Sequence, residues 1–317
     1  MATEFKGLFP AVITPMTPEG RIDEAAFRKV IEFNIQAGVH GFWVAGGSGE
    51  SVLLDDEENR RLAEIVADQS GGRVKNIMHV GAPTTARAAG MAEHAARAGV
   101  EAICCVPPFF YRRSDEEIVA HYRAVAAAAD LPFFVYNLPS ATGVEITPAL
   151  MQKIQEGVPQ LAGLKHSAPV LTHVRAFTRM GLACLIGNCR LMLAALTLGA
   201  SGCVDGPPGM LPELWMALWQ AYQDGELKRA EAAQGRAWDA LDALFACGGG
   251  FHAIMKAVLS ERLGIACGDP TPPAAPLTDE QRAALRLRIA ALGLEDVTAG
   301  CAGTPLPGFR SSREAWS

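Results

Sequence analysis

The sequence contains no apolar run of the length that a membrane-spanning helix needs. Its first residues also lack the charged start and apolar stretch of a secretion signal. No long basic run is present, and the net charge of −6 argues against nucleic acids and anionic membrane surfaces as partners. We therefore expect a cytoplasmic globular protein that binds neither nucleic acid nor membranes.

Motifs for metals and nucleotides are missing as well. The eight cysteines are scattered, with no C-x-x-C pair and no His/Cys cluster at the spacing of a metal site. The glycine-rich stretch 46–50 does not satisfy G-x-G-x-x-G, and no G-x-x-x-x-G-K-[ST] motif occurs. We expect reduced cysteines in the core, no metal and no cofactor.

The chain does contain a regular alternation of short β-rich runs with helical patterns. Such an alternation is typical of a parallel sheet whose strands are connected by crossover helices. Helical patterns cover 23–37, 55–69, 85–98 and 115–129, and Asp55, Ser114 and Thr147 are expected N-caps. We count eight candidate strands, at 8–14, 41–45, 75–80, 102–106, 132–136, 161–165, 183–186 and 202–204.

Eight such units in roughly 220 residues favour a closed (β/α)8 TIM barrel over an open doubly wound sheet. After the last strand the pattern becomes helical, and it includes a Gly248–Gly250 turn and a proline-rich connector over 270–276. We predict a barrel over 1–224, a C-terminal helical region over 225–297 packed on it, and a disordered tail over 298–317.

Two strand ends carry residues suited to chemistry. Lys165 ends the sixth run and Tyr136 ends the fifth, and the active site of a barrel lies at the carboxyl ends of its strands. An amine removed from water loses its proton more readily and can then attack a ketone to form a Schiff base. Taken singly, Lys165 is equally well read as a strand-end lysine reaching water, and Tyr136 as a core aromatic.

The glycine-rich turn after the second run suits an anion. Its backbone N–H groups can approach a carboxylate closely, and Ser48 adds a hydroxyl donor. The alternative is an ordinary tight turn, for which glycine is the usual residue.

Three segments, in this order and spacing, resemble the signatures of the dihydrodipicolinate synthase and N-acetylneuraminate lyase family. They are 46–51 (GGSGES), 136–143 (YNLPSATG) and 163–165 (GLK), and the resemblance extends from residue 5 to about 295. It implies class I aldolase chemistry between pyruvate and an aldehyde, with Lys165 as the Schiff-base lysine and Tyr136 as the acid/base. It also implies a carboxylate clamp at Gly47 and Ser48 and a homotetramer built from dimers.

The chain departs from the dihydrodipicolinate synthase pattern at three places. Gly47-Ser48 stands where those enzymes have Thr-Thr, Phe110 where they have a tyrosine donated across the dimer, and Ala141 where they have an arginine for the aldehyde's carboxylate. These departures together predict a different second substrate, and Tyr111 is a candidate replacement for the relay tyrosine. Candidates to contact the variable half of the substrate are Tyr111, Phe110, Ala141, His166, Ser167, Asn188 and Asp205.

The predicted activity is a lyase that cleaves or forms a C–C bond of a 2-oxo acid, either a 2-keto-3-deoxy sugar acid or a sialic-acid-like compound. The alternatives are a keto-deoxy-sugar-acid dehydratase, a dihydrodipicolinate synthase and a catalytically inactive binding barrel. A metal-dependent aldolase fits poorly, because only His79 and His166 lie near strand ends.

Overall fold

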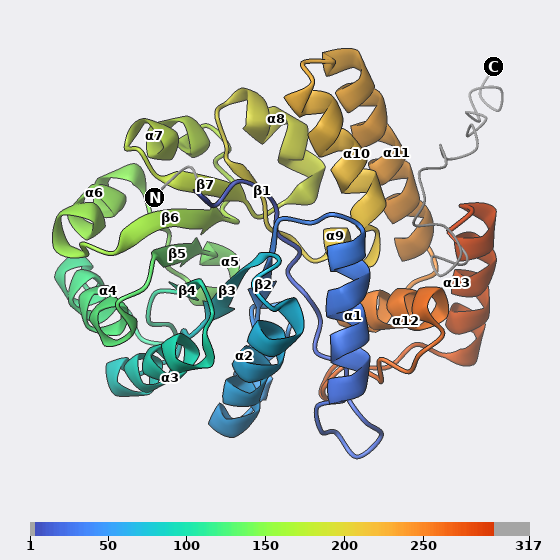
Figure 1. Ribbon diagram of the computed structural model, residues 1–317, viewed down its shortest axis with the longest axis horizontal. Helices are drawn as coiled ribbons and strands as arrows, with labels where there is room; N and C mark the ends of the chain where they lie inside the picture. The colour runs from blue at the N-terminus through green and yellow to red at the C-terminus, as the bar shows by residue number, and fades with distance from the viewer. Residues whose placement is uncertain (1–3, 295–317) are drawn as a thin grey trace.

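The computed structural model describes residues 4–294, and the tail predicted over 298–317 lies outside these residues. Eight parallel strands pair in the order β1-β8-β7-β6-β5-β4-β3-β2. Figure 1 shows them at the centre of a ring of helices. The strands are β1 (Gly7–Leu8), β2 (Gly41–Val44), β3 (Lys75–His79), β4 (Ala102–Cys105), β5 (Phe133–Asn137), β6 (Leu161–His166), β7 (Ala183–Ile186) and β8 (Gly202–Cys203).

The segment after β1 closes the sheet into a barrel. Trp43 N donates to Pro10 O at 2.9 Å, and Ala11 N donates to Asp205 O at 2.8 Å, so this segment joins β2 to β8. The strand predicted over 8–14 is too long, because Pro10 has no N–H to donate to a ladder. The (β/α)8 barrel itself is confirmed, and the open sheet is wrong.

The helices begin where local sequence signals predict them. Asp55, Ser114 and Thr147 are N-caps whose side chains accept a backbone N–H three residues on. The helices of the barrel are α1 (Glu24–Gln36), α2 (Asp56–Ser70), α3 (Thr85–Ala98), α4 (Asp115–Ala129), α5 (Pro139–Thr142), α6 (Pro148–Gly157), α7 (His173–Arg179), α8 (Met192–Thr197), α9 (Pro207–Met210) and α10 (Pro212–Gln223). Short 3₁₀ turns cover Ser51–Leu53 and Cys189–Leu191.

Three further helices follow the barrel: α11 (Leu227–Phe245), α12 (Phe251–Leu263) and α13 (Asp279–Ala291). Figure 1 shows them on the side of the barrel where α1 and α10 lie. The predicted turn between α11 and α12 is present, with φ of 77° at Gly248 and 105° at Gly249. Within residues 4–294 no helix is both long and apolar enough to cross a membrane.

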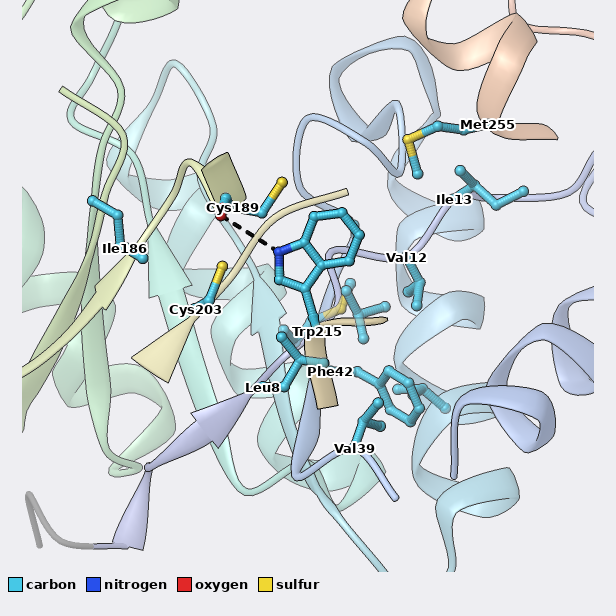
Figure 2. Packing of buried hydrophobic residues seen from close by; sticks show 14 of the residues in the cluster. Leu8, Val12, Ile13, Val39, Phe42, Ile186, Cys189, Cys203, Trp215 and Met255 are labelled. Atoms are coloured by element: carbon cyan, nitrogen blue, oxygen red, sulfur yellow. Dashed lines mark hydrogen bonds between the residues drawn. The ribbon is translucent and has the colours of Figure 1, made fainter. Parts of the chain in front are cut away.

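Buried side chains form two layers on the two faces of the strands. The inner layer fills the barrel and includes Trp43, Phe134 and Tyr136. The outer layer lies between strands and helices and continues into α11, α12 and α13. Figure 2 shows the part of this layer around Trp215 of α10, close to Cys203 of β8. The Nε1 of Trp215 donates to Cys189 O at 3.4 Å.

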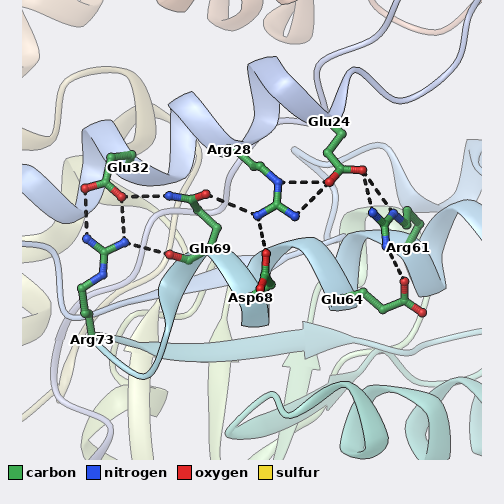
Figure 3. A network of polar contacts seen from close by, with 8 residues as sticks. All are labelled: Glu24, Arg28, Glu32, Arg61, Glu64, Asp68, Gln69 and Arg73. Atoms are coloured by element: carbon green, nitrogen blue, oxygen red, sulfur yellow. Dashed lines mark hydrogen bonds and ion pairs between the residues drawn. The ribbon is translucent and has the colours of Figure 1, made fainter.

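Charged side chains connect α1 and α2 on the surface. Figure 3 shows Arg28 between Glu24 and Asp68, and Arg73 on Glu32 at 2.7 Å. The hydrogen bond from Arg73 lowers the pKa of the Glu32 carboxyl to about 2. Because these pairs are solvated, each contributes little to stability, and we read the network as a solvated helix–helix seam.

Candidate active site

Lys165 and Tyr136 are direct neighbours across two parallel strands. Their Cα atoms are register partners in the β5–β6 pair, so both side chains leave the sheet on the same face. Both are buried, with Lys165 3% exposed. Lys165 Nζ lies 4.5 Å from the centroid of the Tyr136 ring and 5.3 Å from that of Trp43. Among the described residues this amine has no hydrogen-bond or ion-pair partner. Its contacts are with the two aromatic rings, so the amine is free to react with a substrate.

A bulge in β6 sets this alignment. Phe133 pairs with Leu161, but the next residue, Phe134, pairs with Gly163, so Ala162 is the extra residue. Gly163 must be glycine, because a Cβ there would lie 2.2 Å from Ala183 O and 2.6 Å from the Phe134 ring. The bulge therefore re-aims the end of β6, and it brings Lys165 inward beside Tyr136.

Two further rings enclose Tyr136. Trp43 meets it edge to face at a centroid distance of 5.4 Å, and His79 does so at 6.1 Å. His79 Nδ1 lies 3.4 Å from Ser51 Oγ. The sequence does not mark Trp43 or His79 as residues of this site. Their only signal is inward alternation on β2 and β3, which any barrel-filling side chain shares.

Burial, and to a smaller extent the nearby Lys165 charge, lower the pKa of His79 from 6.5 to about 4. The imidazole is therefore neutral at pH 7, and it adds no positive charge next to the lysine. A neutral ring beside Lys165 is compatible with an amine that has to act as a nucleophile.

The His79 ring should make stability depend on pH in a defined window. In the unfolded chain this ring binds a proton below about pH 6.5, whereas in the folded protein it does so only near pH 4. The contribution of the neutral ring to the free energy of unfolding is therefore complete above pH 6.5 and declines as the pH falls towards 4. The measurement is the free energy of unfolding in urea at pH 7 and at pH 5. Between these two values the unmodified protein should lose about 2 kcal/mol more of this free energy than His79→Gln does. Equal losses in the two proteins would contradict the assignment of a buried neutral ring.

The loop 46–50, called the clamp loop below, follows β2 after one residue, Ala45. The N–H groups of Gly49 and Glu50 turn back onto the carbonyls of Gly46 and Gly47. In contrast, the N–H groups of Gly47 and Ser48 have no acceptor within residues 4–294. A Cβ placed on Gly47 would lie 3.8 Å from the Tyr136 hydroxyl, so the two free donors border the Lys165–Tyr136 pair.

Three predicted substrate contacts lie on the loops after β6, β7 and β8. Asp205 uses both carboxylate oxygens on backbone, accepting from Cys189 N and Gly206 N at 2.8 Å each. Asn188 is exposed, and its Oδ1 accepts Arg190 N at 3.1 Å, which leaves its Nδ2 for a ligand. Ser167 donates weakly to Gly187 O at 3.5 Å. Both carboxylate oxygens of Asp205 therefore hold the loop backbone, whereas Asn188 and Ser167 have polar groups that can still bind a ligand.

Three of the other four predicted contacts lie at the surface. Phe110 and Tyr111 are 87% and 66% exposed on the loop after β4, so within one chain they do not enter the barrel interior. Ala141 is exposed on the short helix α5. His166, which strand alternation predicts to face away from Lys165, is buried on the outer side, where its Nε2 lies 3.0 Å from Val170 O.

The cysteines and the possible metal ligands are distributed through the described residues without forming a cluster. The seven cysteines within residues 4–294 are free thiols, and six are buried, as predicted. Burial raises the pKa of Cys184 to about 12, so this thiol is unreactive at neutral pH. No group of three His, Cys, Asp or Glu side chains gathers as a metal site in the described chain, and catalysis without a metal stays a prediction.

Known proteins match over nearly this whole length. The profile of the Dihydrodipicolinate synthetase family matches residues 4–292. A 4-hydroxy-tetrahydrodipicolinate synthase of Methanothrix thermoacetophila is 32% identical over 286 residues, which are 89% of this chain and 95% of that protein. An uncharacterised DapA-like lyase of Halobacterium salinarum is 35% identical over 290 residues, 91% of this chain and 94% of the other.

Solved structures agree with these matches. The sialic acid aldolase of Ruminococcus gnavus superimposes with a TM-score of 0.86 at 26% identity, covering 92% of this chain and 97% of its own. The dihydrodipicolinate synthase of Aquifex aeolicus does so with a TM-score of 0.84 at 26% identity, covering 92% and 99%. The barrel fold and these matches together identify the chain as a carbon–carbon lyase. The chain belongs to the Dihydrodipicolinate synthetase family, as its three signatures predict.

Proposed function

We propose that this protein is a Schiff-base-forming aldolase that cleaves or forms the C–C bond between pyruvate and an aldehyde. Its substrate in the cleavage direction is a 2-keto-3-deoxy sugar acid or a sialic-acid-like 2-oxo acid. The observation that carries the proposal is the register pairing of Lys165 with Tyr136, both buried and facing inward. The two free N–H groups of Gly47 and Ser48 support a carboxylate site beside them.

In the first stage the substrate is joined to the enzyme. The carboxylate accepts hydrogen bonds from the Gly47 and Ser48 N–H groups, which orients the ketone towards Lys165. The lone pair of Nζ adds to C2, and the carbonyl oxygen takes up one proton from Nζ and a second from the Tyr136 hydroxyl, which becomes a phenolate. The oxygen then leaves as water to give a C2=N iminium.

In the second stage the C–C bond breaks. The Tyr136 oxygen accepts the proton of the C4 hydroxyl, the C3–C4 electron pair moves into the iminium, and the aldehyde leaves. The resulting enamine takes up a proton at C3, and water hydrolyses the imine to release pyruvate and the free Lys165 amine. Synthesis is the reverse sequence.

Three residues favour a sugar acid over aspartate semialdehyde. Gly47 leaves the space beside the Tyr136 hydroxyl without a side chain, Phe110 has no hydroxyl, and Ala141 cannot pair with a second carboxylate. A bidentate arginine–carboxylate contact is worth roughly 1.5 to 3 kcal/mol, or about ten- to a hundredfold in rate or affinity.

The second candidate is dihydrodipicolinate synthase. It is favoured by the names of relatives, since the Methanothrix thermoacetophila protein is a 4-hydroxy-tetrahydrodipicolinate synthase. The two activities share Lys165 and Tyr136, so only the second substrate separates them.

A substrate screen tests the choice. We expect turnover of the best 2-keto-3-deoxy sugar acid or sialic acid to exceed condensation of pyruvate with aspartate semialdehyde by at least about tenfold, because the guanidinium is missing. Release of pyruvate marks a lyase, whereas a product that keeps all carbons after loss of water marks a dehydratase. Equal or faster turnover of the semialdehyde would show that the synthase is the activity.

A matched variant strengthens the screen. Gly47→Thr fits sterically, since a Cβ there meets only the Tyr136 hydroxyl at 3.8 Å, and Ala141 is exposed and tolerates arginine. Combining Gly47→Thr with Ala141→Arg should raise semialdehyde condensation relative to sugar-acid cleavage. An unchanged ratio would mean that these positions do not set specificity.

The proposal includes a homotetramer and a cytoplasmic location. Val52 and Leu53 after β2, and Phe110 and Tyr111 after β4, are neighbouring pairs of large exposed apolar or aromatic side chains, and such residues are candidates for an interaction surface. A second copy would cover the ring of Phe110, whose family counterpart is donated across a dimer. Free buried thiols suit a reducing compartment.

A further inference from the structure

A buried ion pair links the clamp loop to the C-terminal helices. Lys256 Nζ of α12 lies 2.7 Å from Glu50 Oε2, and the two side chains are 1% and 2% exposed. Each partner also contacts backbone, because Glu50 Oε1 accepts Thr271 N at 2.8 Å and Lys256 donates to Asp269 O at 3.0 Å. A buried ion pair whose partners are also anchored to backbone holds its two elements in one relative position.

The backbone of the clamp loop needs such support. Glu50 has φ of 57°, and Ala45, just before the loop, has φ of 54°. Residues other than glycine rarely adopt this left-handed conformation, and it persists where surrounding contacts hold it. Glu50 is held by its carboxylate on Lys256, so the helix stabilises the end of the loop.

A second contact from the same helix face reaches the middle of the loop. His252, one turn before Lys256, places Nε2 2.9 Å from Gly47 O, so Nε2 donates and the carbonyl accepts. The Gly47 carbonyl and the Ser48 N–H belong to one planar peptide group and point in opposite directions. Together with Glu50 N, which also donates to this carbonyl, His252 fixes the orientation of the peptide group and therefore the direction of the Ser48 N–H.

We propose that His252 and Lys256 of α12 are positioning residues for the carboxylate clamp, so that the C-terminal helices set the affinity of the barrel for 2-oxo acids. The inference rests on the proposed function of the clamp loop. It assigns α12, which lies beside α1 outside the ring of strands in Figure 1, a role in substrate binding rather than in stability alone.

The test compares two ketones that differ only in the carboxylate. Pyruvate and its methyl ester are each incubated with the full-length protein and borohydride, and the concentration giving half-maximal imine trapping is measured. In His252→Phe this concentration should rise about tenfold for pyruvate and stay unchanged for methyl pyruvate, while trapping at saturation is retained. His252→Gln should restore the pyruvate value, since its amide can donate to Gly47 O.

Controls separate the possible failures. His94→Phe removes another half-buried histidine, on α3, and should change neither value. No trapping by the unmodified protein would overturn the proposed function itself. Normal trapping with an unchanged pyruvate value in His252→Phe, or an equal rise for both ketones, would overturn the positioning role alone.

Lys256 is tested with its partner neutralised. Lys256→Met alone would leave the Glu50 carboxylate buried without a counter-ion, which is strongly destabilising. We therefore combine Lys256→Met with Glu50→Gln, and we expect the same selective rise for pyruvate. Loss of trapping of both ketones in a folded double variant, judged by circular dichroism, would contradict the positioning role of the pair.

Discussion

Lys165→Arg should abolish the borohydride-dependent attachment of pyruvate and reduce turnover to background. Arginine stays protonated and cannot add to a carbonyl, so no iminium forms. The measurement is peptide mapping by mass spectrometry after reduction, which should place the adduct on Lys165 in the unmodified protein. Lys165→Met removes the amine without adding a guanidinium to the barrel interior, and it should give the same result.

Lys256 is an internal control for this experiment. It is the other buried lysine of the site region, but its amine is bound to Glu50 and to the Asp269 carbonyl, so it should remain unmodified. An adduct on Lys256, on a surface lysine or on none would refute the nucleophile assignment, and the mechanism with it.

Tyr136→Phe should lower the rate of C–C cleavage by about a hundredfold to ten-thousandfold, the usual contribution of a positioned acid/base group. This range corresponds to about 3 to 5 kcal/mol in the activation barrier. The ring remains, so its contacts with Trp43, His79 and Lys165 survive. Single-turnover cleavage should therefore slow much more than imine trapping of pyruvate does.

Tyr122→Phe is the matched control. Tyr122 is also fully buried, and its hydroxyl has no hydrogen-bond partner among the described residues, but it packs on Phe133 in the outer layer, away from Lys165. Its loss of a hydroxyl should leave cleavage unchanged. If Tyr136→Phe behaved like Tyr122→Phe, another group would have to carry the proton.

Local signals account for the part of the fold that could be predicted. Capping residues such as Asp55 and Ser114 act within one helical turn, so the helices begin where the pattern indicates. The strand over 8–14 was predicted too long, since apolar composition does not reveal how Pro10 interrupts a ladder. The short helices α5, α7 and α8 were missed, because four to seven residues carry too little periodicity to recognise.

The residues of the site likewise fall into those that the sequence predicts and those that only the structure reveals. Lys165, Tyr136 and the clamp loop were named from strand-end position and signature. The sequence also names Phe110 and Tyr111, and the structure places both at the surface of their own chain rather than in its barrel interior. His252 and Lys256 carried no local signal, because each meets its partner more than 200 residues away along the chain.

The sequence by itself determined the alternation of strands and helices, the family and the two residues proposed for the chemistry, because periodicity, caps and short signatures are properties of neighbouring residues. Only the tertiary structure decided the geometry. The bulge at Ala162 sets the register that brings Lys165 beside Tyr136, and α12 sets the orientation of the clamp loop. Both depend on contacts between distant segments, which arise when the chain closes into a barrel and buries its interior.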